Sequence, residues 1–286
     1  MKKMKKIASF ILAITMAASL AACSQSSSSS SEAESNTSKA SSSADASAET
    51  SSIKTIQDGT LTMSTNAEFE PFEYKENGDI VGIDVEIANK IAEKLNLELN
   101  INDVAFDSLI MELQTNKCDF VAAGMTVTPD REKNVDFSEP YFDASQAIIV
   151  PTGSDIQTPE DLNGKTVGVQ QGTTGDTYCT NEDGSSEVQV DSVKRYNKGA
   201  DAISDLISGR IDAVVIDDFP ATKFVQNNPD KIVKLDDSLT TEEYAIAVQK
   251  DNTALLEQIN SVLDEMKSSG ELDQIIDKYQ SSLGAE

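Results

Sequence analysis

The sequence contains no histidine, and this absence excludes several kinds of chemistry. Ser-His-Asp and Cys-His catalytic sites use an imidazole as general base, so neither can form in this chain. Metal sites that depend on histidine ligands are excluded for the same reason. The composition therefore argues against the common nucleophilic hydrolases and against histidine-ligated zinc.

Cysteine is scarce as well, with only Cys23, Cys118 and Cys179 in 286 residues. Cys118 and Cys179 lie far apart in the sequence, and their spacing matches no metal-binding motif. An extracellular disulfide between them is one interpretation. We favour the other, in which both are small buried apolar side chains.

Basic residues are few: 23 lysines and arginines face 49 acidic residues, for a net charge of −26. Such a chain cannot neutralise the phosphates of a nucleic acid, so we expect no nucleic-acid partner. Direct binding to anionic lipid is disfavoured too. The charge of a ligand stays open, because the local field of a pocket can oppose the net charge.

Long hydrophobic runs are absent except near the start of the chain. Four lysines precede a short apolar run over residues 7–22, which has the form of a secretory signal. Its end, Leu20-Ala21-Ala22-Cys23, resembles the bacterial lipobox. That resemblance implies a signal peptide over residues 1–22, cleavage before Cys23 and lipid such as palmitate on its sulfur. An ordinary signal peptide with an incidental cysteine is the alternative.

Residues 24–52 differ in composition from the rest, because 15 of these 29 residues are serine. A segment with almost no large apolar side chain cannot offset the entropy cost of ordering. We therefore expect residues 23–52 to be a disordered tether behind the lipidated cysteine. The processed chain, with net charge −30, is expected outside the cytoplasm on the membrane of a Gram-positive cell.

From residue 53 onward, strand-like and helix-like apolar patterns alternate. Leu61–Ser64, Phe120–Ala123 and Ile211–Ile216 have the pattern of buried strands. Apolar residues in Ile87–Leu95 and Thr253–Ser268 recur at the spacing of one helix face. Alternating units of this kind predict an α/β fold with a largely parallel sheet.

Three segments together carry the groups that a free amino acid needs. Its carboxylate requires a planar cation, its ammonium an anion, and both require further hydrogen-bond partners when buried. The first segment begins at Ala122 and ends at Arg131. The second, Gly172–Gly175, follows a predicted strand, and the third is a predicted strand that ends at Asp217. Ligands of open α/β sheets bind at such carboxyl ends of strands.

Each of these residues has an ordinary explanation when it is taken alone. Arg131 fits a surface ion pair. Gly172–Gly175 fits a simple turn, and Asp217 with Asp218 fits a helix cap. Phe69 and Phe106 fit a hydrophobic core.

The order of the motifs is more specific than any one of them. Over residues 53–283 the chain resembles the polar amino-acid family of bacterial solute-binding proteins, family 3. The motifs that carry the resemblance are Thr65–Glu73, Gly82–Ile87, Phe106–Ile110, Gly124–Arg131, Val135–Tyr141, Val167–Thr174 and Ser208–Ala213, followed by a helical stretch ending near Tyr279. The resemblance implies a two-lobed fold of the periplasmic-binding-protein-like type II class, with a mixed β-sheet and flanking helices in each lobe.

The resemblance also implies lobe boundaries. The chain is expected to cross a two-strand hinge at about residues 148–151 and again at about 242–245. Lobe one is then 53–149 plus 244–286, and lobe two is 150–243. A ligand in the cleft contacts both lobes, and the lobes close on it.

Site residues follow from the same resemblance. Arg131 is expected to bind the ligand α-carboxylate, helped by the amides of Thr126 and Thr174. The α-ammonium is expected at the Asp217 carboxylate and the Gly124 carbonyl. Phe69 and Phe106 are expected to sandwich the ligand side chain.

Specificity depends on two further positions. Many relatives, including some that bind basic amino acids, have aspartate where this chain has Asn66, and an amide cannot offset a buried cation. Glu68, Glu70 and Asp218 are the alternative sources of a carboxylate. Gln170 matches a position that faces the ligand side chain. These two amides favour a neutral polar ligand, with a basic one as the alternative.

The implied function is a receptor that delivers a free amino acid to the permease of an ABC transporter. We expect a monomer without metal or cofactor, joined to the membrane by its lipid. Two alternatives remain. Cyclohexadienyl dehydratases share this fold and also use an arginine on a carboxylate, and loss of prephenate would reveal that activity. A sensor would bind ligand without any role in uptake.

Overall fold

The computed structural model describes residues 53–182, 184, 186 and 188–282. The expected signal peptide, Cys23 and the serine-rich tether lie outside these residues. None of the helices in the described part is both long and apolar enough to cross a membrane.

The first sheet has five strands, of which β1 pairs in parallel with β5 and β6, while β15 is antiparallel to β6 and β7. Its order is β5 (Glu98–Asp103), β1 (Thr60–Thr65), β6 (Phe120–Val121), β15 (Ala247–Gln249) and β7 (Val135–Phe137). A small antiparallel sheet beside it consists of β2 (Glu68–Phe69), β3 (Glu73–Glu76) and β4 (Asp79–Val81).

Helices cover both faces of the first sheet. Neighbouring side chains of β6 point to opposite faces and therefore pack in two different cores. Phe120 packs in the core that also contains side chains of α1 and α7, whereas Val121 packs against α2. The helices of this lobe are α1 (Ile83–Leu95), α2 (Leu109–Gln114), α3 (Pro129–Glu132), α7 (Thr253–Ser269) and α8 (Glu271–Ser282). The 3₁₀ turn Phe106–Ser108 leads into α2.

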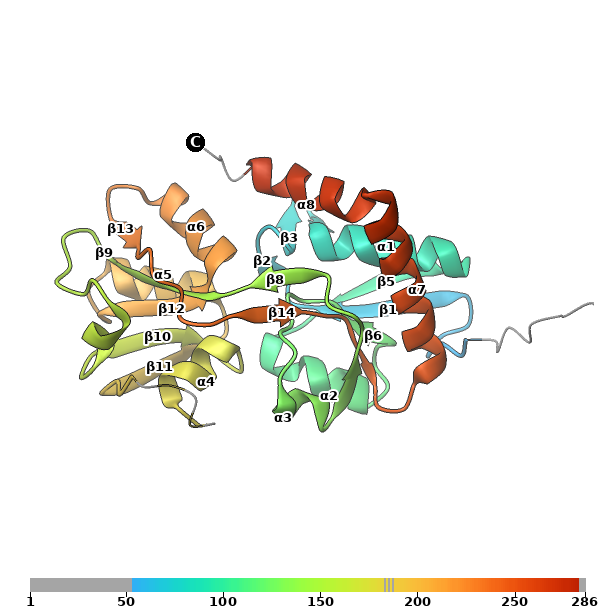
Figure 1. The fold of residues 1–286 in the computed structure, drawn as a ribbon, viewed down its shortest axis with the longest axis horizontal. Helices are drawn as coiled ribbons and strands as arrows, with labels where there is room; N and C mark the ends of the chain where they lie inside the picture. The colour runs from blue at the N-terminus through green and yellow to red at the C-terminus, as the bar shows by residue number, and fades with distance from the viewer. Residues whose placement is uncertain (1–52, 183, 185, 187, 283–286) are drawn as a thin grey trace, which may run out of the picture. The chain divides into compact units, whose positions relative to one another are not determined.

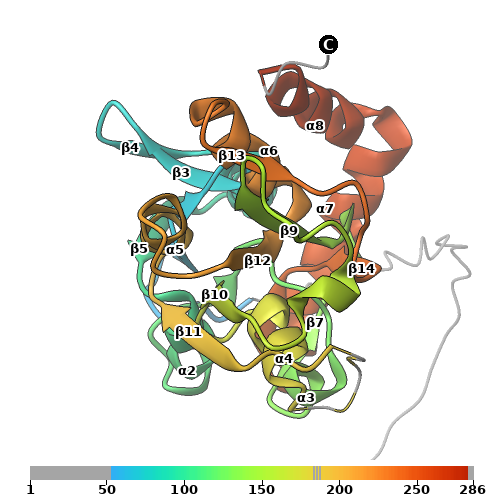
Figure 2. The same ribbon diagram turned by 90° about the vertical axis from the view of Figure 1, so that its left-hand side faces the viewer.

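The second sheet is mixed in the same way: β10 pairs in parallel with β11 and β12, and β9 is antiparallel to β12 and β13. Its order is β11 (Ser192–Tyr196), β10 (Thr166–Gln170), β12 (Ala213–Asp217), β9 (Gln146–Pro151) and β13 (Ile232–Lys234). Its helices are α4 (Thr174–Thr180), α5 (Gly199–Ile207) and α6 (Asp218–Asn227), with a 3₁₀ turn at Pro159–Leu162. Alternation along β12 places Val215 in the core with α4 and Val214 in the core with α5 and α6. Figure 2 shows the strands and helices of this lobe from its own side.

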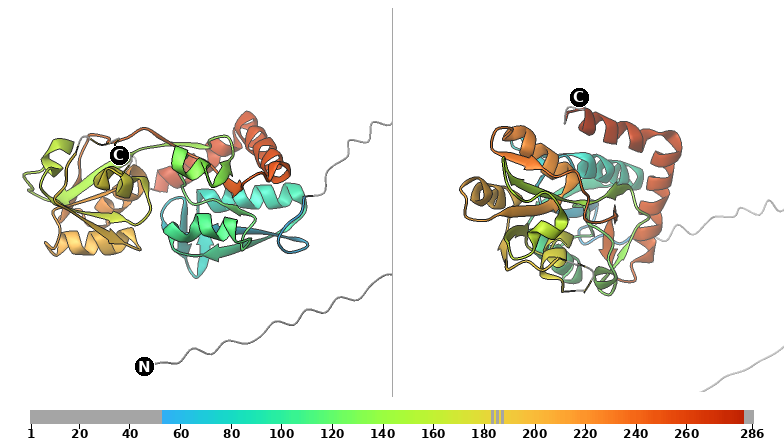
Figure 3. Two further views of the ribbon diagram at one scale, coloured as in Figure 1. Left: turned by 90° about the horizontal axis from the view of Figure 1, so that it is seen from below. Right: turned by 60° about the vertical axis from the view of Figure 1, so that its left-hand side comes forward.

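Two short antiparallel strands connect the lobes, β8 (Phe142–Ala144) and β14 (Glu242–Tyr244). They run side by side between the two sheets in Figure 1, and Figure 3 shows the same connection from below. The chain leaves the first lobe at β8, earlier than the expected residues 148–151. Ile148 of β9 instead pairs with Val215 inside the second sheet. A run of buried β-branched residues has the same sequence pattern in a hinge strand as in a strand inside a sheet. The sequence therefore did not show that β9 belongs to the second sheet.

The mixed two-lobed α/β architecture agrees with the expected fold class. Cys118 and Cys179 are both free and buried, which confirms the interpretation that we favoured. They belong to two different cores, one in each lobe.

Gly82 fixes the start of α1 and generates a stability prediction. Its φ is +133°, and a Cβ there would lie 2.1 Å from the carbonyl oxygen of Phe72. That oxygen accepts a hydrogen bond from the amide of Asp84. The replacement Gly82→Ala must therefore displace backbone, and we expect it to lower the free energy of unfolding by at least about 3 kcal/mol.

The matched control is Gly209→Ala, because Gly209 also has positive φ (+68°) but no atom within 4 Å of a Cβ. It should cost only about 1–2 kcal/mol. Equilibrium urea unfolding measures both. Equal losses for the two variants would show that the contact with Phe72 does not constrain α1.

Candidate ligand-binding cleft

One narrow cavity between the lobes brings all of the expected ligand-binding residues together. Glu73 and Thr173, which the sequence analysis did not select, line it too. The expected residues in its wall are Asn66, Phe69, Phe106, Gly124, Thr126, Arg131, Gln170, Thr174 and Asp217.

Arg131 lies in α3, whose first turn is capped by the side chain of Thr128. Its Nη1 donates to the carbonyl oxygen of Thr126 at 2.7 Å, and its Nη2 donates across the cleft to that of Gly172 at 3.1 Å. The guanidinium also stacks over the ring of Phe106, 5.3 Å from the ring centre. Burial lowers the pKa of Arg131, while Glu242 is the strongest of the carboxylates that oppose this shift. The side chain remains a cation at physiological pH.

Gly124 follows β6 at a position that requires glycine. Its φ is +50°, and a Cβ would approach Cε1 of Phe69 to 2.7 Å. The buried carboxylate of Asp84 accepts the Gly124 amide at 2.8 Å and the hydroxyl of Tyr141 at 2.7 Å. These contacts hold the loop that leads to Thr126.

The second lobe contributes Asp217, the last residue of β12. Its Oδ1 accepts the Tyr244 hydroxyl at 2.5 Å. Burial, and then the negative charge of Glu242, raise the pKa of Asp217 to about 7. A nearby ammonium would favour the ionised form and lower this pKa again.

Asn66 and Gln170 bind each other across the cleft. Gln170 Nε2 donates to Asn66 Oδ1 at 2.9 Å, and Asn66 Nδ2 donates to the carbonyl oxygen of Val104 at 2.9 Å. The Gln170 amide nitrogen also contacts the carbonyl oxygen of Asn197 at 3.3 Å. This amide pair therefore has few donors left for a neutral polar ligand.

Glu73 is the most unusual residue in the cavity wall. Its side chain is fully buried, and within the described part of the chain neither carboxyl oxygen makes a hydrogen bond of ordinary geometry, although the carboxyl group of Asp84 lies close enough to share a proton with it. Burial is the main cause that raises its pKa well above the ordinary value, followed by the charge of Asp84. A buried carboxyl group is costly, which is why such a group marks a functional site.

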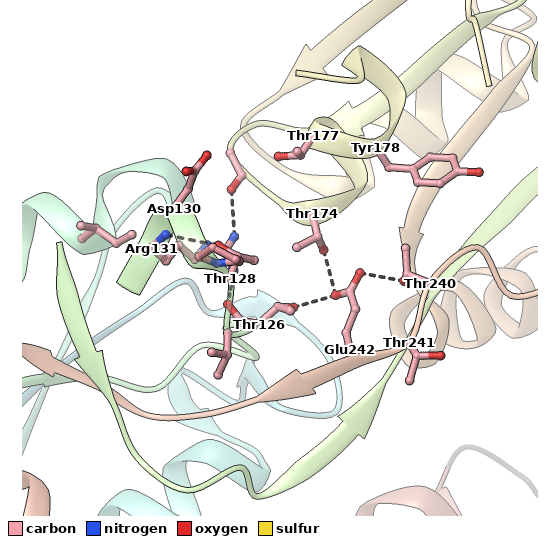
Figure 4. Close-up of a pocket in the computed structure, with 14 residues that line it drawn as sticks. Thr126, Thr128, Asp130, Arg131, Thr174, Thr177, Tyr178, Thr240, Thr241 and Glu242 are labelled. Atoms are coloured by element: carbon pink, nitrogen blue, oxygen red, sulfur yellow. Dashed lines mark hydrogen bonds between the residues drawn. The ribbon is translucent and has the colours of Figure 1, made fainter. Parts of the chain in front are cut away.

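A second, wider pocket adjoins the cavity and shares Thr126, Arg131 and Thr174 with it. Glu242 of β14 lies in its wall, and Figure 4 shows the hydrogen bonds that this side chain accepts. In the residues that the structure describes, no cluster of acidic and cysteine side chains fits a metal ion.

Two glutamates that line the pockets, Glu73 and Glu242, were not among the predicted site residues, although the sequence contained a partial indication of each. Glu73 ends the first motif, Thr65–Glu73, but a charged residue at a strand start is usually exposed. Glu242 shares a strand face with Tyr244, because side chains two positions apart point the same way. An aromatic neighbour of that kind indicates a buried face.

Comparison with known proteins identifies the family. The model of bacterial extracellular solute-binding proteins, family 3, matches residues 61–282. The chain is 38% identical over 224 residues to the arginine-binding extracellular protein ArtP of Bacillus subtilis, covering 77% of this chain and 85% of that protein. It is 35% identical over 229 residues to a probable histidine-binding protein of Neisseria gonorrhoeae, covering 78% and 84%.

A solved structure supports the same assignment. The arginine-bound form of truncated ArgBP from T. maritima is 49% identical in sequence and superimposes with a TM-score of 0.68, covering 73% of this chain and 96% of that one. The expected family and two-lobed fold are thereby confirmed. The chain belongs to family 3 of the bacterial extracellular solute-binding proteins.

Proposed function

We propose that this protein captures a basic L-amino acid, arginine foremost, and delivers it to the permease of an ABC transporter. Family membership supports the receptor role. The relatives named for arginine and histidine support a basic ligand. These relatives are binding proteins, which favours a receptor over the dehydratase alternative.

The cleft offers partners for both charges of an amino acid. Arg131 supplies a fork that suits the α-carboxylate, with the backbone amides of Thr126 and Thr174 beside it. Asp217 and the Gly124 carbonyl supply acceptors for the α-ammonium. Phe69 and Phe106 line the same cavity and offer apolar surface to the stem of a side chain.

Glu73 is the observation that carries the choice of a basic ligand. A guanidinium has five N–H donors and no acceptor, so it needs acceptors in the wall of its site. Glu73 provides a buried carboxyl group whose only close polar neighbour in the described residues is Asp84, and Gln170 keeps its carbonyl oxygen after both amide contacts are made. Position 66 holds an asparagine where many relatives have an aspartate, but Glu73 still gives the cleft a carboxyl group.

A basic ligand therefore replaces the neutral polar ligand that Asn66 and Gln170 favoured in the sequence. That preference depended on Asn66 and Gln170 being free to read a neutral side chain. Because the two amides bind each other, the Glu73 carboxyl group is the stronger indication of which class of amino acid binds. A neutral ligand such as glutamine is now the second candidate.

Lobe closure is the mechanism that we infer. Arg131 and Thr126 belong to the first lobe, whereas Thr174 and Asp217 belong to the second. A ligand that contacts both sets binds the closed form more tightly, and such differential affinity is what shifts a conformational equilibrium. The closed form then docks on the permease, whose ATPase supplies the work.

The location of the protein remains part of the proposal. A lipid on Cys23 and a serine-rich tether would hold the receptor at the outer face of the membrane while it samples the solution. The family is extracellular, in agreement with that placement. We propose that the protein acts as a monomer.

A thermal-shift screen of residues 53–286 against the twenty amino acids tests the ligand class. A ligand at ~1,000 times its Kd stabilises by roughly 4 kcal/mol, which for this size raises Tm by about 8–16 °C. We expect the largest shift with arginine, then with lysine or histidine. A largest shift with glutamine or another neutral amino acid would refute the basic ligand, and no shift at all would refute the receptor.

The variant Glu73→Gln tests the role of the buried carboxyl. A glutamine cannot ionise when the ligand binds, so this variant should weaken arginine binding at least about tenfold, because the guanidinium loses a partner that becomes charged beside it. Glutamine binding should change much less. The control is Glu76→Gln, since Glu76 is an exposed residue of the same strand. Calorimetry that finds equal arginine affinity for the two variants would contradict this role.

A further inference from the structure

Glu242 occupies a position in the cleft that the proposed ligand contacts do not use. It belongs to β14, one of the two strands that connect the lobes, and only 6% of its surface is exposed. Its neighbour Glu243 is exposed and has its side chain on the opposite face of the strand. A buried acid in the hinge, next to a binding cavity, needs an explanation.

Hydroxyl groups of both lobes hold the Glu242 carboxylate (Figure 4). Its Oε2 accepts from Thr126 Oγ1 of the first lobe at 2.6 Å and from Thr174 Oγ1 of the second lobe at 2.9 Å. Its Oε1 accepts from Thr240 Oγ1 at 2.7 Å. The carboxylate is therefore fixed where the two lobes meet.

These bonds also decide what the two threonines can offer a ligand. Each hydroxyl has a single proton, and Thr126 and Thr174 both donate theirs to Glu242. Their hydroxyl oxygens then present only lone pairs to other groups. An added anion gains nothing from them, so the backbone amides and Arg131 remain as the donors for a carboxylate.

A count of charges at the cleft shows what Glu242 adds. A bound amino acid uses Arg131 for its carboxylate and Asp217 for its ammonium, and these four charges cancel. Glu73, which lines the same cavity, is the proposed partner of a basic side chain and is therefore assigned as well. Glu242 is left over, because no lysine or arginine in the described ranges forms an ion pair with it. Its field reaches both other groups: it is the main charge acting on Arg131 and on Asp217.

We propose that Glu242 is a specificity-determining residue, whose carboxylate gives the cleft a surplus negative charge that selects amino acids with a net positive charge. The proposal rests on the proposed function and extends it to a residue on the hinge. It acts over a distance rather than by direct contact with the ligand side chain. Such a field is effective in a poorly solvated cleft, where charges are weakly screened.

The test compares arginine with citrulline, which has nearly the same shape but an uncharged urea group. Wild-type protein, Glu242→Gln and the matched control Glu243→Gln are each titrated with both ligands by calorimetry. The readout is the ratio of the two dissociation constants, which does not depend on the folded fraction of a sample. We expect Glu242→Gln to reduce the preference for arginine roughly tenfold, and Glu243→Gln to leave it unchanged.

Glu242→Asp separates charge from shape. It keeps the negative charge while shortening the side chain, so the preference for arginine should stay within about threefold of the wild-type value even if both affinities fall. If Glu242→Gln instead weakens arginine and citrulline equally, Glu242 only supports the structure and the inference is wrong.

The two proposals fail in different ways. Wild-type protein that binds neither arginine nor citrulline contradicts the proposed function. Wild-type protein that prefers arginine, together with a Glu242→Gln variant whose preference is unchanged, contradicts only the role of Glu242.

Discussion

The structure depends on one constraint: four carboxyl groups, those of Asp84, Asp217, Glu73 and Glu242, are buried near a single arginine at the junction of two lobes. Burial of so many acidic groups is unfavourable unless protons or cations balance them. The protein does so in part with protons, since the pKa values of Asp217 and Glu73 are raised. A ligand with two positive groups and one negative group supplies what the protein lacks. The affinity for a basic amino acid that we propose would then follow from the charges that folding has buried.

The fold brings these groups together from distant parts of the chain. Asp217 ends a strand of the second sheet, Glu73 begins a strand beside the first sheet, and Glu242 lies in the hinge itself. Since the chain crosses between the lobes at β8 and β14, opening the cleft separates Thr126 from Thr174 with little change inside either lobe. In the mechanism that we propose, ligand capture and lobe closure are the same event, as a receptor that presents a closed form to a permease requires.

The sequence predicted the fold class and the residues whose backbone positions are fixed by local motifs. Gly124 follows a strand of the first sheet and Asp217 ends a strand of the second, and the resemblance to the family predicted that both lie in one cleft with Arg131. Three features were not predicted. Ile148 in β9 has the same β-branched pattern in a sheet as in a hinge. The bond between Asn66 and Gln170 joins segments 104 residues apart, and no local pattern encodes it. Glu242 and Glu243 form one acidic pair in the sequence, and only tertiary packing decides which of them is buried.

The most direct test of this account is a count of the protons that leave the protein when arginine binds. Calorimetric titrations near pH 7, in two buffers with different ionisation enthalpies, give that number. Burial and the charge of Glu242 raise the pKa of Asp217 to about 7, so part of the protein carries a proton there before binding, and the ligand ammonium drives that proton off. The account predicts a net release of protons when arginine binds, with affinity that rises from pH 5 to pH 8. Binding without any proton release, at an affinity independent of pH, would contradict the claim that the ligand neutralises the buried carboxyl groups.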